Sequence, residues 1–175
     1  MNDIQSLLDF WKQDSDTNPN ISAWRTTPSR PSQTHPLPDD LPASLQEALS
    51  SRGIFSLYSH QLSAWAQSRA GKNIILSTGT ASGKTLSYNL PVLAKIIQHP
   101  EARALYLFPT KALTQDQLSS LTNFNVSSAI YDGDTPQGQR STIRKNANIV
   151  LSNPDMLHTG ILPHHVNWNE FFTTL

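Results

Sequence analysis

A run of small residues that ends in Gly-Lys-Thr constrains this chain more than any other feature of its sequence. The run is Thr78-Gly79-Thr80-Ala81-Ser82-Gly83-Lys84-Thr85. It follows a short apolar, isoleucine-rich segment, 73–77, and precedes a helical pattern over 83–98 that Pro91 must kink or interrupt. Small residues let successive backbone N–H groups turn toward phosphate oxygens, and a helix N-terminus adds a partial positive charge. The sequence therefore predicts a strand, a phosphate-binding loop and a helix, in that order.

Two side chains of this loop have specific chemical roles in phosphate binding. Lys84 is expected to reach the β- and γ-phosphates of a nucleotide, and the Thr85 hydroxyl is expected to coordinate Mg²⁺. We take these two as the candidate catalytic residues and the whole loop as the candidate ATP site. The full motif has glycine five residues before Gly83, where this chain has Thr78. The alternative is an ordinary small-residue turn, which the flanking strand and helix patterns disfavour.

Strand-like and helical patterns alternate through residues 54–175. Such alternation predicts an α/β fold in which a parallel sheet carries helices on both faces. Besides 73–77, strands are predicted at 104–108, 128–131 and 148–151, and helices at 59–71 and 110–121, with further helix starts at Pro136 and Pro154.

Residues 1–53 lack this alternation and are expected to form an N-terminal extension. Residues 4–11 have a short amphipathic helical pattern, and Ser44 and Glu47 have the spacing of a capping box for a second short helix. Between them, residues 14–42 contain six of the twelve prolines, which predicts an irregular arm. The predicted domains are therefore 1–53 and 54–175.

Composition excludes several classes of protein. The chain has no cysteine, which rules out disulfides, thiol catalysis and cysteine zinc sites. Its longest apolar run, 104–108, is too short to span a bilayer, and no secretory apolar region follows the start, so a cytoplasmic location is predicted. The 13 basic and 13 acidic side chains balance, so any contact with nucleic acid would depend on locally placed donors.

Five blocks of sequence follow one another along residues 54–175 in a fixed order. They are Leu57-Tyr58-Ser59-His60-Gln61, the loop 78–85, Phe108-Pro109-Thr110-Lys111-Ala112-Leu113, Tyr131-Asp132-Gly133-Asp134-Thr135-Pro136 and Ser152-Asn153-Pro154-Asp155-Met156-Leu157-His158. Their order and spacing resemble the first RecA-like domain of superfamily 2 DExD/H-box helicases. More narrowly the chain is similar to the MrfA-like branch, repair-associated DNA helicases whose full-length members carry a C-terminal cysteine-rich zinc domain. The resemblance implies a P-loop RecA-like fold, ATP and Mg²⁺ as cofactors, and DNA as the favoured partner.

The resemblance also implies a role for Gln61. In the family, a glutamine upstream of the phosphate loop reads adenine, and an amide can satisfy the adenine edge with a donor and an acceptor. Tyr58 or Phe55 would then pack on the base. From the residues alone, Gln61 would be a polar residue in the first turn of a helix.

Three further segments would contact the nucleic-acid backbone if the resemblance holds. The segment Pro109-Thr110-Lys111 is expected to hold a phosphate with helix N-terminal N–H groups and the Thr110 hydroxyl. The Asp-Gly and Asn-Pro pairs of the other two are equally common in ordinary turns. The candidate residues are Pro109, Thr110, Lys111, Gly133, Asn153, Pro154 and Asp155.

Two other groups of polar residues have simpler interpretations. Arg140 and Arg144 lie one helical turn apart and could face DNA, although a solvated helix face is the preferred interpretation. His158, His164 and His165 lack a cysteine or suitably spaced carboxylate partner, so we expect surface or capping histidines and not metal ligands.

Hydrolysis in this superfamily requires a strand that ends in Asp-Glu, and the sequence contains no such pair. We therefore expect a helicase portion that ends inside its first motor domain, with an incomplete sheet, exposed apolar faces and no ATP hydrolysis by itself. Two alternatives stay open, a different phosphate-loop enzyme such as a small-molecule kinase, and a non-catalytic remnant that binds nucleic acid.

Overall fold

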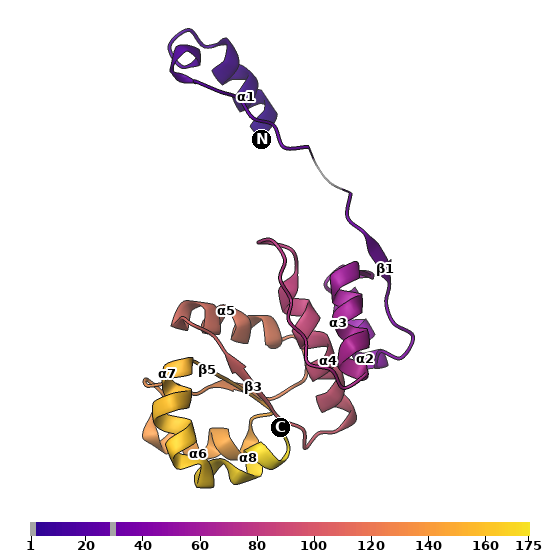
Figure 1. Ribbon diagram of the computed structural model, residues 1–175, viewed down its shortest axis with the longest axis vertical. Coiled ribbons are helices and arrows are strands. Elements are labelled where there is room, and N and C mark those ends of the chain that lie inside the picture. The colour runs from indigo at the N-terminus through magenta and orange to yellow at the C-terminus, as the bar shows by residue number, and fades with distance from the viewer. Residues whose placement is uncertain (1–2, 29–30) are drawn as a thin grey trace. The chain divides into compact units, whose positions relative to one another are not determined.

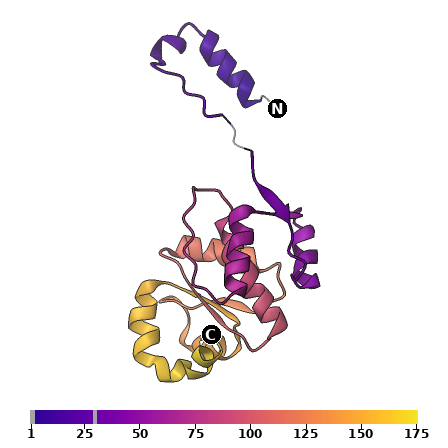
Figure 2. The same cartoon turned by 45° about the vertical axis from the view of Figure 1, so that its right-hand side comes forward.

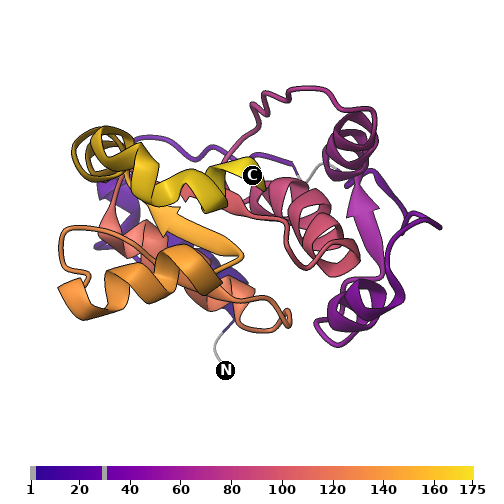
Figure 3. The same ribbon diagram turned by 90° about the horizontal axis from the view of Figure 1, so that it is seen from below.

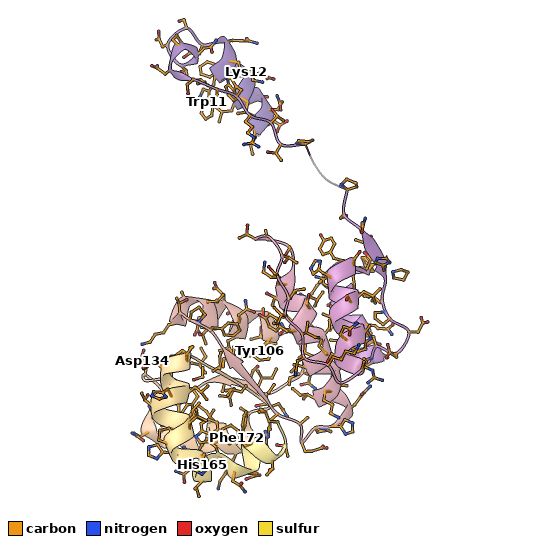
Figure 4. The ribbon with its side chains drawn as sticks, in the orientation of Figure 1. Trp11, Lys12, Tyr106, Asp134, His165 and Phe172 are labelled. Atoms are coloured by element: carbon orange, nitrogen blue, oxygen red, sulfur yellow. The ribbon has the colours of Figure 1, made fainter. Side chains whose placement is uncertain are left out.

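The computed structural model describes residues 3–28 and 31–175, and the chain divides into two compact units, Met1–Ser32 and Gln33–Leu175. The smaller unit contains helix α1 (Ile4–Gln13) and the 3-10 turn η1 (Asn18–Asn20) (Figure 1). The Lys12 ammonium lies 5.2 Å from the centre of the Trp24 ring, and Trp11 precedes Lys12 on α1 (Figure 4). The helix predicted at 4–11 is thereby confirmed.

The larger unit is built on a parallel sheet of three strands, β3 (Ala104–Leu107), β4 (Ser128–Ile130) and β5 (Ile149–Ser152), in the order β3-β5-β4. All four residues of β5 are buried, as expected for a central strand covered on both sides. Ile149 and Leu151 point into one apolar cluster, whereas Val150 between them points into a second.

Helices cover both faces of this sheet. The first face packs against α4 (Lys84–Gln98) and α5 (Lys111–Leu121), which contribute Leu90, Leu93 and Leu121 to the first cluster. The second face packs against α6 (Gln137–Asn146) and α8 (Asn169–Thr173). This arrangement confirms the predicted parallel α/β fold.

A helical segment with a kink at His164 joins β5 to α8. It consists of α7 (Pro154–Met156), the π-helical turn η2 (Leu157–Ile161) and the 3-10 segment η3 (Leu162–Trp168). Figure 3 shows this segment, in yellow, running alongside the strands. Its Trp168 ring meets the rings of Tyr131 and Phe171 edge-on, at centroid distances of 4.7 and 5.4 Å. These aromatic contacts hold the segment against the second face of the sheet.

Part of the predicted irregular arm is ordered and belongs to the larger unit. Strand β1 (Thr34–Pro36) pairs antiparallel with β2 (Ser56–Tyr58). Helix α2 (Ala43–Ser50) buries Leu45 and Leu49 in the first cluster. The division of the chain into 1–53 and 54–175 stays a prediction.

The predicted capping box of α2 is wrong. The helix begins at Ala43 with Pro42 as its N-cap, and no side chain caps it. Ser44 therefore already lies inside the first turn, where its hydroxyl is not at the N-cap position.

The predicted strand at 73–77 is also wrong. Residues 72–79 have no regular secondary structure (Figure 2), and the Ile75 side chain is 97% exposed. A strand needs a hydrogen-bonded neighbour, and the strands of the described chain pair only as β1-β2 and β3-β5-β4. The apolar pattern of 73–77 has no partner strand here.

The other predicted elements differ from the structure only at their ends. Helix α3 (Ser59–Arg69) and helices α4 and α5 lie within the predicted ranges. Helix α4 continues through Pro91, so the proline does not end it. Pro154 is the first residue of α7 as predicted, whereas Pro136 is the N-cap of α6 and the helix starts one residue later. No helix among the described residues is long and apolar enough to cross a membrane.

Candidate nucleotide and nucleic-acid site

The phosphate loop is folded around its own lysine. The Lys84 ammonium donates to the carbonyl oxygen of Thr78 at 3.0 Å and also to that of Gly79. The Ser82 hydroxyl oxygen lies at 3.5 Å from the same nitrogen. The cation is therefore held by carbonyl groups of the loop itself. A phosphate that binds here would draw the ammonium away from the carbonyls, because a charged acceptor forms the stronger hydrogen bond.

Thr78, which departs from the standard motif, has a structural role in the loop. Its hydroxyl and that of Ser82 lie 2.6 Å apart and form a hydrogen bond across the loop. Ala81 between them adopts a positive φ of 55°, a left-handed conformation that non-glycine residues seldom adopt. The two ends of the loop are therefore joined by the hydrogen bond between Thr78 and Ser82. A glycine in place of Thr78 has no hydroxyl and could not form this bond.

Gly83 links the loop to α4 and to Gln61. It is the N-cap of α4 with φ 76°, a conformation that favours glycine. A Cβ atom at this position would lie 2.7 Å from Nε2 of Gln61 and 3.6 Å from the nearest ring carbons of Tyr58. Both the backbone conformation and the close approach of Gln61 therefore require glycine here.

Gln61 connects the start of α3 to the phosphate loop. It is only 4% exposed; its amide oxygen accepts from the backbone N–H of Tyr58 at 2.9 Å, and its amide nitrogen donates to the Gly83 carbonyl at 2.9 Å. An amide has two hydrogens and two oxygen lone pairs, so one of each remains. Those two groups are the ones that the edge of adenine would require. Tyr58 is 41% exposed beside them, whereas Phe55 is 69% exposed.

The proposed nucleic-acid segments meet at one edge of the sheet. Strands β3, β4 and β5 are parallel, with Leu107 opposite Ser152 and Ile130 opposite Leu151. Their carboxyl ends therefore lie at the same edge, which is where open α/β sheets bind ligands. The sequence-predicted residues that follow these three ends are Pro109, Thr110, Lys111, Gly133, Asn153, Pro154 and Asp155.

Two of these segments begin helices with side-chain caps. The Thr110 hydroxyl oxygen accepts from the Leu113 N–H at 3.3 Å, and Asn153 accepts from the Met156 N–H at 2.8 Å. Thr110 and Lys111 are both exposed. Each helix start presents N–H groups that lack intrahelical partners, and α5 is eleven residues long. The helix caps and the predicted phosphate contacts are compatible, because capping uses the hydroxyl as an acceptor and leaves its hydrogen free.

Lys111 forms an ion pair that the sequence did not predict. Its ammonium contacts the carboxylate of Asp134, which projects from the surface of the larger unit (Figure 4). The hydrogen bond from Lys111 to Asp134, together with the negative charge of that carboxylate, raises the pKa of Lys111. Both side chains are more than 60% exposed, so the pair is screened by solvent and adds little stability. It does place a carboxylate beside one of the candidate phosphate contacts.

The turn around Gly133 is held in place by two side chains. Thr135 accepts from the Asp132 N–H at 2.9 Å, and Arg140 donates to the carbonyls of Thr135 and Asp132 at 3.0 and 3.1 Å. Arg140 and Arg144 are half-buried, so the preferred interpretation of a solvated helix face is wrong for both. The reason is that α6 packs against the aromatic residues Tyr131 and Trp168, which lie over the second face.

The loop fits a nucleotide phosphate in its donor groups. It brings together the Lys84 ammonium, the hydroxyl groups of Thr78 and Ser82, and the N-terminus of the fifteen-residue helix α4. Thr85 lies in the first turn of α4, where its hydroxyl would face a metal bound to the phosphates. The described residues contain no cluster of three or more histidine, aspartate or glutamate side chains that could hold a metal by themselves.

Comparison with known proteins establishes the family. Residues 58–174 match the model of the DEAD/DEAH box helicase family, and the chain belongs to that family. It is similar to the ATP-dependent helicase YprA of Bacillus subtilis, with 48% identity over 90% of this chain and 22% of that protein.

Two crystal structures of the DUF1998 helicase MrfA resemble this chain closely. The MrfA structure bound to DNA has a TM-score of 0.89 and 44% identity over the whole of this chain. The MrfA structure bound to DNA and AMPPNP has a TM-score of 0.81 and 49% identity over 83% of this chain. This chain spans between 21% and 25% of the length of those two structures and of YprA. These similarities confirm the predicted RecA-like fold and the resemblance to the MrfA-like branch.

Proposed function

We propose that this chain is the ATP- and DNA-binding N-terminal portion of an ATP-dependent DNA helicase. The observation that carries the proposal is the bond between Gln61 and Gly83, 2.9 Å long, which joins a candidate adenine contact to a phosphate loop. The helicase activity is proposed for a longer protein, because this chain covers 22% of the length of YprA. A cytoplasmic location stays a prediction from the sequence.

The residues of this chain would divide the work of nucleotide binding. Gln61 would bind the adenine edge with its remaining N–H and lone pair, and Tyr58 would lie beside the base. Lys84 would move from the loop carbonyls to the β- and γ-phosphates, and Thr85 would bind Mg²⁺. In the full protein, the bound nucleotide supplies the free energy of hydrolysis that drives movement along the strand.

The DNA contacts would run along the carboxyl edge of the sheet. Pro109, Thr110 and Lys111 would hold one phosphate at the start of α5, and Gly133 would hold the next. Asn153, Pro154 and Asp155 would contact a third phosphate at the start of α7. The similarity to MrfA, whose structures contain DNA and AMPPNP, supports this assignment.

The test is binding of fluorescein-labelled single-stranded DNA by the 175-residue chain, measured by fluorescence anisotropy at several salt concentrations. Contacts to the backbone should give equal affinity for oligonucleotides of different sequence, and a shallow salt slope of about −0.7 per phosphate contacted. A kinase specific for a small molecule would show no DNA binding. Strong preference for one base sequence would contradict backbone recognition.

A further inference from the structure

A pocket lies between α6 and the segment η2–η3. Its volume is about 460 Å³, and no acidic side chain lines it. The polar lining residues that matter for the argument are Gln137, Arg140, Arg144, Thr159, His164 and Asn167. The pocket is therefore rich in hydrogen-bond donors and in positive charge, in a chain whose formal net charge is zero.

The two arginines of this pocket have unequal roles. Arg140 is engaged with the Asp132–Thr135 turn through two hydrogen bonds, and its guanidinium lies 5.3 Å from the centre of the Tyr131 ring. Arg144 makes one long bond, 3.4 Å to the Tyr131 hydroxyl. In the described part of the chain neither arginine has an ion-pair partner. Since a guanidinium has five N–H groups, most donors of Arg144 remain free.

The aromatic residues orient Arg144 toward the pocket. Its guanidinium lies 6.0 Å from the centre of the Trp168 ring, and Trp168 is 1% exposed in the second cluster. A guanidinium stacked on a fixed ring loses little side-chain entropy when a ligand binds. Its planar fork matches two oxygens of a phosphate, and the amides of Gln137 and Asn167 can add further donors.

The position of the pocket favours the phosphate of a nucleic-acid strand. Arg140 lines the pocket and also holds the Asp132–Thr135 turn, so the pocket adjoins the segment that contains Gly133. Met156, next to the candidate residue Asp155, lines it as well. The pocket thus adjoins two of the segments proposed to contact the backbone, those that contain Gly133 and Asp155.

We propose that this pocket binds a backbone phosphate of the DNA strand, with Arg144 as its main ligand and Arg140 as the residue that positions the Gly133 turn. This inference rests on the proposed DNA-binding function and extends it to a site on α6. The shared chemistry, a phosphate oxygen pair on a guanidinium, would also fit free phosphate, which the experiment separates from DNA.

The experiment compares Arg144→Gln with Lys145→Gln in the 175-residue chain. Lys145 is the neighbouring residue on α6, is exposed and does not line the pocket, so it serves as the control. Each variant removes one positive charge. Anisotropy with an oligodeoxythymidylate of about 20 nucleotides, at about 50 to 200 mM KCl, gives the affinity and its salt slope. We expect Arg144→Gln to reduce the slope by about 0.7 and the affinity about tenfold at low salt, and Lys145→Gln to leave the slope unchanged.

A second pair of variants leaves the stacking on Trp168 intact. Gln137→Glu places a carboxylate in the pocket, whereas Gln139→Glu places one on the same helix turn outside it. Both glutamines are exposed, so neither substitution should unfold the chain. Gln137→Glu should weaken DNA binding more than Gln139→Glu does, because only its charge faces the phosphate.

Four results would overturn the proposal. In the first, Arg144→Gln and Lys145→Gln lower affinity and slope equally, which indicates a general effect of charge. In the second, inorganic phosphate at constant ionic strength raises the melting temperature of the unaltered chain but not that of Arg144→Gln, and the two proteins bind DNA equally. This result would mean that the pocket binds free phosphate and not DNA. In the third, the unaltered chain binds no DNA, which also removes the proposed function. DNA binding with an unchanged slope in Arg144→Gln removes only the pocket.

Discussion

Lys84 is the residue on which the proposed nucleotide binding would depend most directly. Its ammonium is held by the Thr78 and Gly79 carbonyls, which lie in the loop and outside the core. Lys84→Ala should weaken binding of a fluorescent ATP analogue about 10- to 150-fold, the loss of a charge-assisted hydrogen bond of about 1.5 to 3 kcal/mol. Thermal unfolding should be unchanged. Lys72→Ala, at an exposed position before the loop, is the control, and equal binding by both variants would contradict the phosphate-loop assignment.

Alanine substitutions at Gly83 and Gly79 test whether backbone conformation in the same loop contributes to stability. Gly83 has φ 76° and lies against Gln61, whereas a Cβ at Gly79 would meet nothing within 4 Å. Gly83→Ala should cost about 1 to 2 kcal/mol of stability, from a left-handed conformation and the displacement of Gln61. Nucleotide affinity should fall with it. Urea unfolding of Gly83→Ala and Gly79→Ala measures the difference, and equal unfolding midpoints would show that the close contact has no energetic consequence.

At the scale of elements, a buried hydrogen bond joins β3 to α4. The Tyr106 hydroxyl donates to Oδ1 of Asn89 at 2.9 Å, and Tyr106 itself lies on β3 (Figure 4). Tyr106→Phe should cost about 1 to 2 kcal/mol near neutral pH, because the buried Asn89 oxygen loses its donor. Tyr58→Phe, on a side chain 41% exposed, is the control and should cost little.

The same tyrosine makes stability depend on alkaline pH. Burial, and secondarily the nearby Tyr88, raise the pKa of Tyr106 far above its usual range. A group whose pKa is raised in the folded state stabilises the fold below the unfolded pKa of about 10, and this contribution is lost as pH rises above it. The stability difference between the unaltered chain and Tyr106→Phe should therefore shrink above about pH 10. Urea midpoints across this range provide the measurement, and a constant difference would contradict the buried phenol.

Because residues 73–77 form no strand, we expect substitutions there to change the free energy of unfolding very little. Ile75 is 97% exposed, whereas Ile149 on β5 is fully buried. Ile75→Val should change the free energy of unfolding by less than about 0.5 kcal/mol, and Ile149→Val should cost about 0.5 to 1.5 kcal/mol. Unfolding in urea distinguishes them. A large cost at Ile75 would mean that the 73–77 segment packs on something in solution.

At the scale of the whole molecule, both apolar clusters belong to the larger unit. The most N-terminal buried residue of the first cluster is Leu41, and β1 begins at Thr34. A chain of residues 33–175 should therefore melt at about the same temperature as the full chain. Removal of residues 1–42 deletes β1 and Leu41 and should lower the melting temperature by several degrees, since burial of a leucine contributes about 1.5 to 3 kcal/mol. Equal melting of the two shortened chains would show that β1 and Leu41 are dispensable.

Local sequence determined most of the elements and where the candidate phosphate loop lies. The alternation of apolar patterns predicted β3, β4, β5 and the helices α3 to α5, because periodicity and capping residues act over a few neighbouring positions. The Gly-Lys-Thr run predicts a phosphate loop for the same reason: the role expected of each residue follows from its own chemistry and from the helix that begins beside it.

Tertiary structure decided what depends on partners distant in the chain. Residues 73–77 have the composition of a strand, yet a strand exists only where another supplies its hydrogen bonds. Thr34–Pro36 has the composition of a loop and becomes a strand because Ser56–Tyr58 pairs with it. The carboxylate beside Lys111 comes from a residue 23 positions away, and the pocket around Arg144 forms where α6 meets the segment η2–η3, so neither follows from a local pattern.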